Sequence, residues 1–192
     1  MIAILKYNAG NTKSVQNAIE RLGYKCIVSD DVLELQAADK VIFPGVGEAA
    51  SAMEYLKAKG LDVVLKKLTQ PVLGICLGLQ LMCKSSEEGA TEGLGIFDVL
   101  VKKFPPTGIV PHMGWNNFSV VDSPLFKGIL AEDNIYFVHS YYAELSENTI
   151  AQCDYLLPFS AALQKDNFYA VQFHTEKSGA VGEQILKNFL AL

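Results

Sequence analysis

The chain has 192 residues, of which 50% are hydrophobic, so we expect a single domain over residues 1–192 with a sizeable core. Sixteen Lys and Arg against 21 Asp and Glu give a net charge of −5, which argues against a nucleic acid or an anionic membrane as the main partner. No apolar stretch reaches the roughly 20 residues of a membrane span, and residues 1–7 lack the basic start of a signal peptide, so we expect a cytoplasmic protein.

Short apolar runs alternate with amphipathic segments in the first half of the chain. Residues 2–6, 25–28, 41–43 and 72–75 are typical of buried parallel strands. Helical spacing of apolar residues predicts helices over residues 12–22, 48–59 and 62–68. This alternation predicts an α/β fold with a doubly wound, flavodoxin-like, mostly parallel sheet flanked by helices.

The second half has few helical segments. Residues 93–121 and 135–174 hold strand-like runs separated by Pro, Gly, Asp and Asn, which predicts antiparallel strands at one edge of the sheet. Residues 178–192 predict a closing helix with Val181, Ile185, Leu186 and Phe189 on its buried face.

Cys76 lies in the pentapeptide Gly74-Ile75-Cys76-Leu77-Gly78, between a predicted strand and a helix predicted over residues 79–84. This is the setting of a nucleophile elbow, where glycines avoid collisions at a sharp turn. The Leu77 amide would then point at an oxyanion on an acyl group attached to Cys76. A buried structural cysteine is the alternative. The spacing of the other three cysteines fits neither a disulfide framework nor a zinc site, so they are expected to be packing residues.

His174 and Glu176 follow a predicted strand, two residues apart. Strand alternation would put both on one face, where Glu176 orients the imidazole and His174 acts as general base toward Cys76. A satisfied, partly buried histidine is the alternative for His174. The three histidines show no metal-ligand spacing, so no metal is predicted.

Gly45-Val46-Gly47 lies between a predicted strand and a predicted helix and fits two uses. It matches part of a dinucleotide fingerprint, although the next strand ends in Cys76 rather than in an acid. The preferred interpretation is that a backbone N–H of Val46 or Gly47 completes an oxyanion hole with Leu77. A cofactor-binding module with a structural Cys76 stays the alternative, and otherwise no cofactor is expected.

Several segments together carry a resemblance to a known family. They are Pro44-Gly45-Val46-Gly47, Gly74 to Leu81, Phe173-His174-Thr175-Glu176-Lys177-Ser178, Val110 to Asn116 and Tyr7 to Asn11. In order and spacing they are similar to the triad-type, class I glutamine amidotransferases, and within them to the glutaminase subunits of imidazole glycerol phosphate synthase. The resemblance covers essentially the whole chain. One departure is Thr175, where relatives usually carry Pro.

The resemblance implies hydrolysis of glutamine to glutamate and ammonia through a thioester on Cys76. It also implies a heterodimer with a cyclase subunit, which is a (β/α)₈ barrel whose interior conducts the ammonia to a nucleotide substrate of histidine biosynthesis. A glutaminase serving an anthranilate or carbamoyl phosphate synthase is the alternative within the same chemistry.

The resemblance further implies two groups of residues with defined roles. Glutamine would be bound by Gln80, Glu88, Ser140 and Tyr141. Gln80 also lies one helical turn after Cys76, so its amide can reach the same pocket. The segment near the partner barrel would include Pro111, His112, Met113, Trp115 and Asn116, with Trp115 as a candidate anchor.

Overall fold

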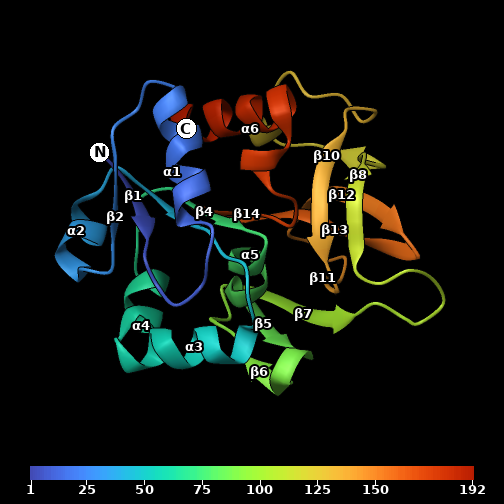
Figure 1. Cartoon of the computed structure of the whole chain (residues 1–192), viewed down its shortest axis with the longest axis horizontal. Coiled ribbons are helices and arrows are strands. Elements are labelled where there is room, and N and C mark those ends of the chain that lie inside the picture. Colours follow the sequence, from blue (N-terminus) through green and yellow to red (C-terminus); the bar gives the residue numbers. More distant parts are fainter.

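Five parallel strands form one side of the main, eight-stranded sheet in the computed structural model, which describes residues 1–192 (Figure 1). In spatial order these are β2 (Cys26–Ser29), β1 (Ile2–Leu5), β3 (Lys40–Phe43), β4 (Val72–Ile75) and β14 (Phe168–Val171). The antiparallel strands β13 (Leu157–Lys165), β12 (Thr149–Tyr155) and β9 (Val120–Val121) continue the sheet to its edge. The predicted α/β fold class is confirmed.

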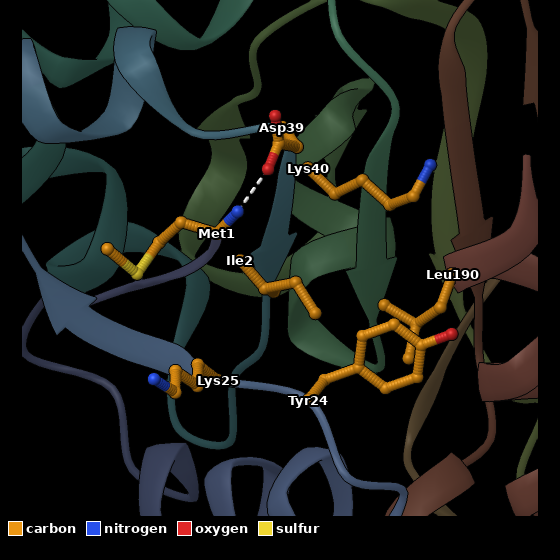
Figure 2. Close-up of a pocket in the computed structure, with 7 residues that line it drawn as sticks. All are labelled: Met1, Ile2, Tyr24, Lys25, Asp39, Lys40 and Leu190. Atoms are coloured by element: carbon orange, nitrogen blue, oxygen red, sulfur yellow. Dashed lines mark hydrogen bonds and ion pairs between the residues drawn. The ribbon is translucent and has the colours of Figure 1, made fainter.

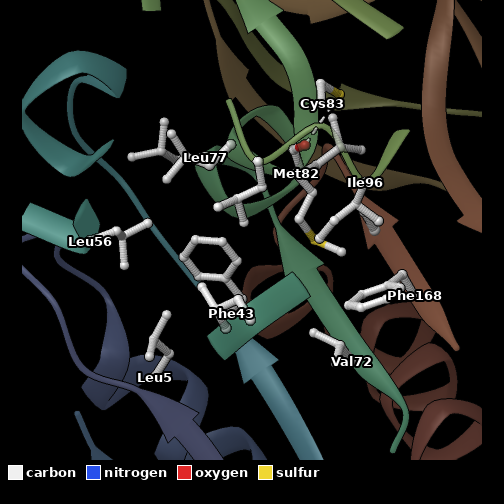
Figure 3. Close-up of a cluster of buried hydrophobic side chains, with 14 of the residues drawn as sticks. Leu5, Phe43, Leu56, Val72, Leu77, Met82, Cys83, Ile96 and Phe168 are labelled. Atoms are coloured by element: carbon white, nitrogen blue, oxygen red, sulfur yellow. Dashed lines mark hydrogen bonds between the residues drawn. The ribbon is translucent and has the colours of Figure 1, made fainter. Parts of the chain in front are cut away.

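Helices cover both faces of this sheet, as Figure 1 shows. One face carries α1 (Thr12–Arg21) and α6 (Gly179–Ala191), and the other carries α2 (Val32–Ala37), α3 (Ala49–Ala58), α4 (Leu61–Lys66) and α5 (Leu77–Met82). A hydrophobic core lies on each face of the sheet, and the side chains of β1 alternate between them. Ile2 and Ile4 pack toward α1, while Ala3 and Leu5 pack toward α3. Figure 3 shows part of the core on the α3 side of the sheet, around Phe43 and Leu56.

Two smaller sheets lie beside the main one. Strands β11 (Tyr141–Ala143), β7 (Phe97–Lys103), β5 (Cys83–Ser86) and β6 (Thr91–Glu92) form the first, and β10 (Ile135–His139) pairs with β8 (His112–Asn116) in the second. Three short 3₁₀ turns complete the chain: η1 (Glu88–Ala90), η2 (Pro124–Phe126) and η3 (Thr175–Lys177). None of the helices has both the length and the apolar composition needed to span a membrane.

The structure differs from the expected elements in three places. Helix α2 was not predicted, because Leu35 is its only buried residue and its one signal is the Asp31 cap, which accepts from the Leu33 and Glu34 amides. Helix α5 begins at Leu77 rather than at residue 79 and ends at Met82, since the next residue enters β5. The strands of the second half are not all at one edge, because β14 lies in the centre, parallel to β4.

Candidate active site

Cys76 stands at the turn between β4 and α5 with φ 53° and ψ −105°, a conformation that a non-glycine residue rarely adopts. Its amide is fixed by a 2.8 Å hydrogen bond to the Val171 carbonyl of the neighbouring strand β14. A Cβ at Gly78 would lie 1.9 Å from the Phe43 carbonyl oxygen, so only glycine allows α5 to pack this close to β3. The predicted elbow therefore has its structural basis in the strained turn and the close approach behind it.

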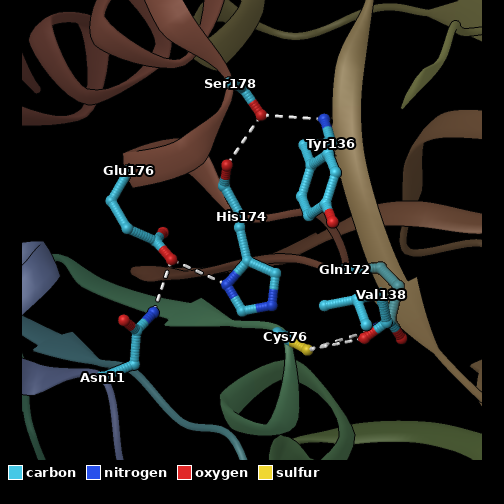
Figure 4. A network of polar contacts seen from close by, with 8 residues as sticks. All are labelled: Asn11, Cys76, Tyr136, Val138, Gln172, His174, Glu176 and Ser178. Atoms are coloured by element: carbon cyan, nitrogen blue, oxygen red, sulfur yellow. Dashed lines mark hydrogen bonds and ion pairs between the residues drawn. The ribbon is translucent and has the colours of Figure 1, made fainter. Parts of the chain in front are cut away.

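His174 follows β14 just as Cys76 follows the adjacent parallel strand β4, so both lie at the carboxyl ends of the strands. The Nδ1 atom of His174 lies 2.7 Å from the Glu176 Oε1 atom, and the Asn11 amide donates to that same oxygen. The buried Nε2 atom has no hydrogen-bond partner and points toward the Cys76 sulfur (Figure 4). The three side chains have the order that nucleophile, base and orienting acid require.

Strand alternation is the wrong explanation for the His174–Glu176 contact, although the contact exists. Strand β14 ends at Val171, and Glu176 lies in the turn η3 rather than on a continuing strand. Two neighbours hold the backbone before this turn. Ser178 Oγ donates to the His174 carbonyl at 2.6 Å and accepts from the Tyr136 amide at 2.9 Å (Figure 4). The His174 amide also donates to the Tyr136 carbonyl.

Burial and mutual contacts set the charges of this group. Burial lowers the pKa of His174, but its interactions with Cys76 and Glu176 outweigh burial and raise that pKa to about 9. Burial raises the pKa of Glu176, yet the His174 hydrogen bond and charge hold it below its usual value. Burial raises the pKa of Cys153 to about 12 and also raises that of Cys83, so both thiols stay protonated near neutral pH. All four cysteines are free.

A pocket of about 300 Å³ opens beside Cys76. The predicted oxyanion and glutamine residues all line it, together with two residues that were not predicted. In chain order the lining is Val46, Gly47, Cys76, Leu77, Gln80, Glu88, Pro111, Val138, His139, Ser140 and Tyr141. No group of three or more His, Cys, Asp or Glu side chains is arranged to hold a metal ion.

Gln80 is buried and connects the pocket wall to Cys76 through hydrogen bonds. Its Nε2 atom donates to the Tyr141 carbonyl at 3.0 Å and to the Gln172 Oε1 atom at 3.1 Å. Gln172 in turn lies with its Nε2 atom 3.7 Å from the Cys76 sulfur, where it donates a hydrogen bond. Neither Gln172 nor Asn11 was predicted as a site residue from the sequence. For Gln172 the available signal was a polar residue directly after an apolar strand, one position before the His174 motif begins.

The predicted oxyanion hole is not open in this conformation. The Leu77 amide donates to the Gly45 carbonyl at 3.3 Å, and the Val46 amide has no hydrogen-bond partner. The loop is held by the Gly10 amide, which donates to the Val46 carbonyl, and by Tyr7, whose hydroxyl donates to the Pro44 carbonyl at 2.7 Å. The Leu77 and Val46 amides thus both lie beside Cys76, but the Leu77 amide is already paired with the Gly45 carbonyl.

The family profile of the class-I glutamine amidotransferases matches residues 3–192. The chain belongs to the class-I glutamine amidotransferases. A curated relative from Bacteroides fragilis, named imidazole glycerol phosphate synthase subunit HisH, is 59% identical over 100% of this chain and 99% of its own length. A relative of the same name from Yersinia pestis is 48% identical over 100% of this chain and 99% of its length. These matches confirm the prediction of a glutamine amidotransferase subunit of that synthase.

Solved structures support the fold of this amidotransferase. The structure of a putative GMP synthase subunit from Thermoplasma acidophilum has a TM-score of 0.75 at 20% identity and covers 100% of this chain and 92% of its own. A second structure, described as a glutamine amidotransferase, has a TM-score of 0.76 at 18% identity, covering 99% and 97%.

The glycine loop of the amidotransferase does not have the setting of a dinucleotide site. A dinucleotide fingerprint binds pyrophosphate on the free N–H groups at the start of the following helix. Here the Glu48 carboxylate accepts from the Ala50 and Ser51 amides, and Glu88 accepts from the Ala49 amide at 2.9 Å. Two carboxylates therefore occupy the start of α3, which disfavours the alternative of a cofactor-binding module.

The predicted partner residues on β8 point to opposite sides of the strand, some outward and some into the interior. Met113 and Trp115 point outward, with 62% and 58% of their surface exposed. His112 is buried and stacks on Tyr155 with 3.9 Å between ring centroids. The structure thus places the His112 side chain in the interior rather than on the partner surface, because strand alternation turns it away from Met113.

Two further hollows of the amidotransferase lie away from Cys76. Figure 2 shows one at the amino ends of β1 and β3, where the Met1 ammonium pairs with Asp39 beside Lys40 and Tyr24. A wider one of about 520 Å³ runs along β5, β6 and β7. Neither contains a residue of the predicted site.

Proposed function

We propose that residues 1–192 act as one glutaminase domain within a cytoplasmic heterodimer that makes imidazole glycerol phosphate for histidine biosynthesis. In this proposal the chain hydrolyses glutamine, and a cyclase partner with a (β/α)₈ barrel consumes the ammonia. The observation that carries the proposal is the arrangement of Cys76, His174 and Glu176 beside the 300 Å³ pocket.

The first half-reaction forms a thioester. The Cys76 thiolate attacks the side-chain carboxamide carbon of glutamine, giving a tetrahedral intermediate with a negatively charged oxygen. Protonated His174 then gives its proton to the leaving nitrogen, the carbon–nitrogen bond breaks and ammonia departs. The raised pKa of His174 supports this role, because it favours the protonated imidazole that gives its proton to the leaving nitrogen.

The second half-reaction releases glutamate. His174 takes a proton from a water molecule, whose oxygen attacks the thioester carbon, and the carbon–sulfur bond breaks to restore the Cys76 thiolate. Glu176 holds the imidazole in one orientation throughout, through the contact of its Oε1 atom with Nδ1 of His174. The Asn11 amide donates to the same oxygen and so keeps the carboxylate in place.

Oxyanion stabilisation requires a change in the glycine loop. Turning the Gly45–Val46 peptide would remove the Gly45 carbonyl from the Leu77 amide and point the unpaired Val46 amide at the same place. Two donors would then meet the developing charge. The resting chain is therefore proposed to be nearly inactive until its partner is engaged.

The partner is proposed to dock on the exposed side of β8. Met113 and Trp115 supply the apolar surface expected of an interface anchor, and Pro111 lies both next to this strand and in the pocket wall. Asn116 is half-buried and donates to the Asp154 carbonyl, so it would support the surface.

The test is the rate of ammonia release from glutamine by the chain alone, with the cyclase barrel, and with the barrel plus its nucleotide ligand. Very low release alone and a large increase with both are expected. Cys76→Ala should abolish release, while added ammonia still supports the cyclase reaction. High release that ignores the partner would overturn the regulatory part, and release by Cys76→Ala would overturn the mechanism.

A further inference from the structure

His112 and His139 form a buried pair directly behind the glutamine pocket, with 3% and 6% of their surface exposed. The His112 Nδ1 atom lies 3.0 Å from the His139 Nε2 atom. At the outer end the Asn116 amide lies 3.4 Å from the His112 Nε2 atom, and at the inner end the His139 Nδ1 atom lies 2.7 Å from the Tyr141 carbonyl oxygen. The four residues make one continuous row of contacts from β8 to the pocket wall.

Both rings are neutral near pH 7. Burial lowers the pKa of His112 to about 4, and burial is also the main cause that lowers the pKa of His139 to about 3. A neutral imidazole has one nitrogen that donates and one that accepts. Each ring can therefore pass a hydrogen bond along the row in only one direction.

One backbone group fixes that direction for the whole row. The Tyr141 carbonyl can only accept, so the proton of His139 must be on Nδ1, which leaves its Nε2 atom as an acceptor. The proton of His112 must then also be on Nδ1, and its Nε2 atom accepts from Asn116. Both histidines are thus held as Nδ1–H tautomers, whereas free histidine favours Nε2–H.

The row ends at the group that also holds Gln80. The Tyr141 carbonyl accepts a second hydrogen bond, from the Gln80 Nε2 atom at 3.0 Å, and Gln80 continues through Gln172 to Cys76. A carbonyl oxygen has two lone pairs, so the two donors together satisfy and orient it. Losing the His139 donor would free the Tyr141 segment, which lines the pocket, to move.

We infer that His112 and His139 are positioning residues for glutamine, which hold the Tyr141 carbonyl and the Gln80 amide in place as an Nδ1–H tautomer pair. This inference rests on the proposed function, because it assigns the pair to the pocket of that glutaminase. Neither histidine touches the reacting atoms in this assignment. Their effect is on how well the pocket fits glutamine.

The first test reads the tautomers directly and does not depend on activity. The chain has only three histidines, so ¹H–¹⁵N spectra of the full chain with labelled histidine can be assigned with single His→Phe variants. Neutral Nδ1–H rings are expected for both His112 and His139 at pH 7. An Nε2–H or cationic form of either ring would overturn the inference.

The second test separates positioning from general stability. In the complex with the cyclase barrel and its nucleotide ligand, His139→Phe should raise the KM for glutamine about 3- to 10-fold, the worth of about one neutral hydrogen bond, with kcat within about 2-fold. His139→Asn can place an amide N–H where Nδ1 was and should recover most of the KM. His112→Phe keeps the stacking on Tyr155 and should have a smaller effect.

The matched control is Asn188→Leu on α6. It removes three hydrogen bonds, two donated to the Leu125 and Lys127 carbonyls and one accepted from the Gln184 amide, and none of these partners lines the pocket. It should lower the melting temperature without changing KM. An unchanged KM in His139→Phe, or equal KM values in His139→Phe and His139→Asn, would overturn the inference. A wild-type complex that releases no ammonia would instead contradict the proposed function, and the tautomer spectra would still decide the state of the pair.

Discussion

Replacing Gly45 with Ala should strain the loop beside Cys76, and a second substitution at Tyr7 should relieve much of the strain. A Cβ at position 45 would lie 2.0 Å from the Tyr7 hydroxyl oxygen and 3.2 Å from the Leu77 Cβ. Tyr7 is buried and its hydroxyl donates to the Pro44 carbonyl, so the side chain has no free space into which it could turn.

The size of the effect follows from these contacts. Overpacking of this kind costs about 1–3 kcal/mol. Tyr7→Phe alone loses one buried hydrogen bond and should cost about 0.5–1.5 kcal/mol. Since Phe has no hydroxyl to meet the new methyl group, the double variant should be about 1–2 kcal/mol more stable than the sum of the two single effects.

Urea unfolding of the four proteins at one pH measures this coupling. A coupling energy of the predicted sign supports the close contact between Gly45 and the tyrosine hydroxyl. Single effects that simply add, within about 0.5 kcal/mol, would refute the reasoning and mean that the loop moves away from Tyr7 at no cost. The same variants in the glutaminase assay show whether Ala at position 45 also hinders the proposed peptide turn.

Three further changes test individual contacts of the site. Thr175→Pro should raise the free energy of unfolding by about 0.4–1 kcal/mol, measured by thermal or urea unfolding. The Thr175 amide donates no hydrogen bond, its buried hydroxyl has no partner, and proline suits the first position of a helical turn. A less stable variant would contradict this prediction. Glu176→Gln should lower the pKa of His174 from about 9 in an NMR titration. Because that value lies above the roughly 6.5 of an unfolded histidine, the contacts of His174 with Cys76 and Glu176 stabilise the wild type below about pH 6.5, and this contribution is lost as the pH rises through about 9. The loss should be smaller in the variant, which keeps only the Cys76 contact. Gln172→Leu should slow alkylation of Cys76 about 10-fold at constant pH by removing a donor to its sulfur, and an unchanged rate would mean that this contact does not act on the thiolate.

Local patterns were sufficient to predict most of the fold. The short apolar runs became β1 to β4, and the glycines around Cys76 marked the strained turn, because only glycine fits beside the Phe43 carbonyl. The position of β14 could not be predicted in this way. Its residues have the same apolar character as the edge strands, and only pairing with β4, distant in the sequence, sets it in the centre.

The candidate site shows the same limit. Spacing brought out Cys76, His174 and Glu176, but the carboxylate reaches the imidazole through the turn η3, which strand alternation does not describe. Asn11 contributes from a position 165 residues away along the chain, so no local pattern could indicate its role. The occupied Leu77 amide depends on the direction of one peptide in the glycine loop, and many sequences permit both directions.

The assignment of Cys76 as the nucleophile is tested most directly by finding where an electrophilic glutamine analogue attaches to the protein. The chain, in complex with the cyclase barrel, would be incubated with the analogue, digested and mapped by mass spectrometry. One adduct on Cys76, suppressed by excess glutamine and greatly slowed in His174→Ala, is the expected result. An adduct on Cys26, Cys83 or Cys153, or none in a preparation that hydrolyses glutamine, would contradict the proposed mechanism.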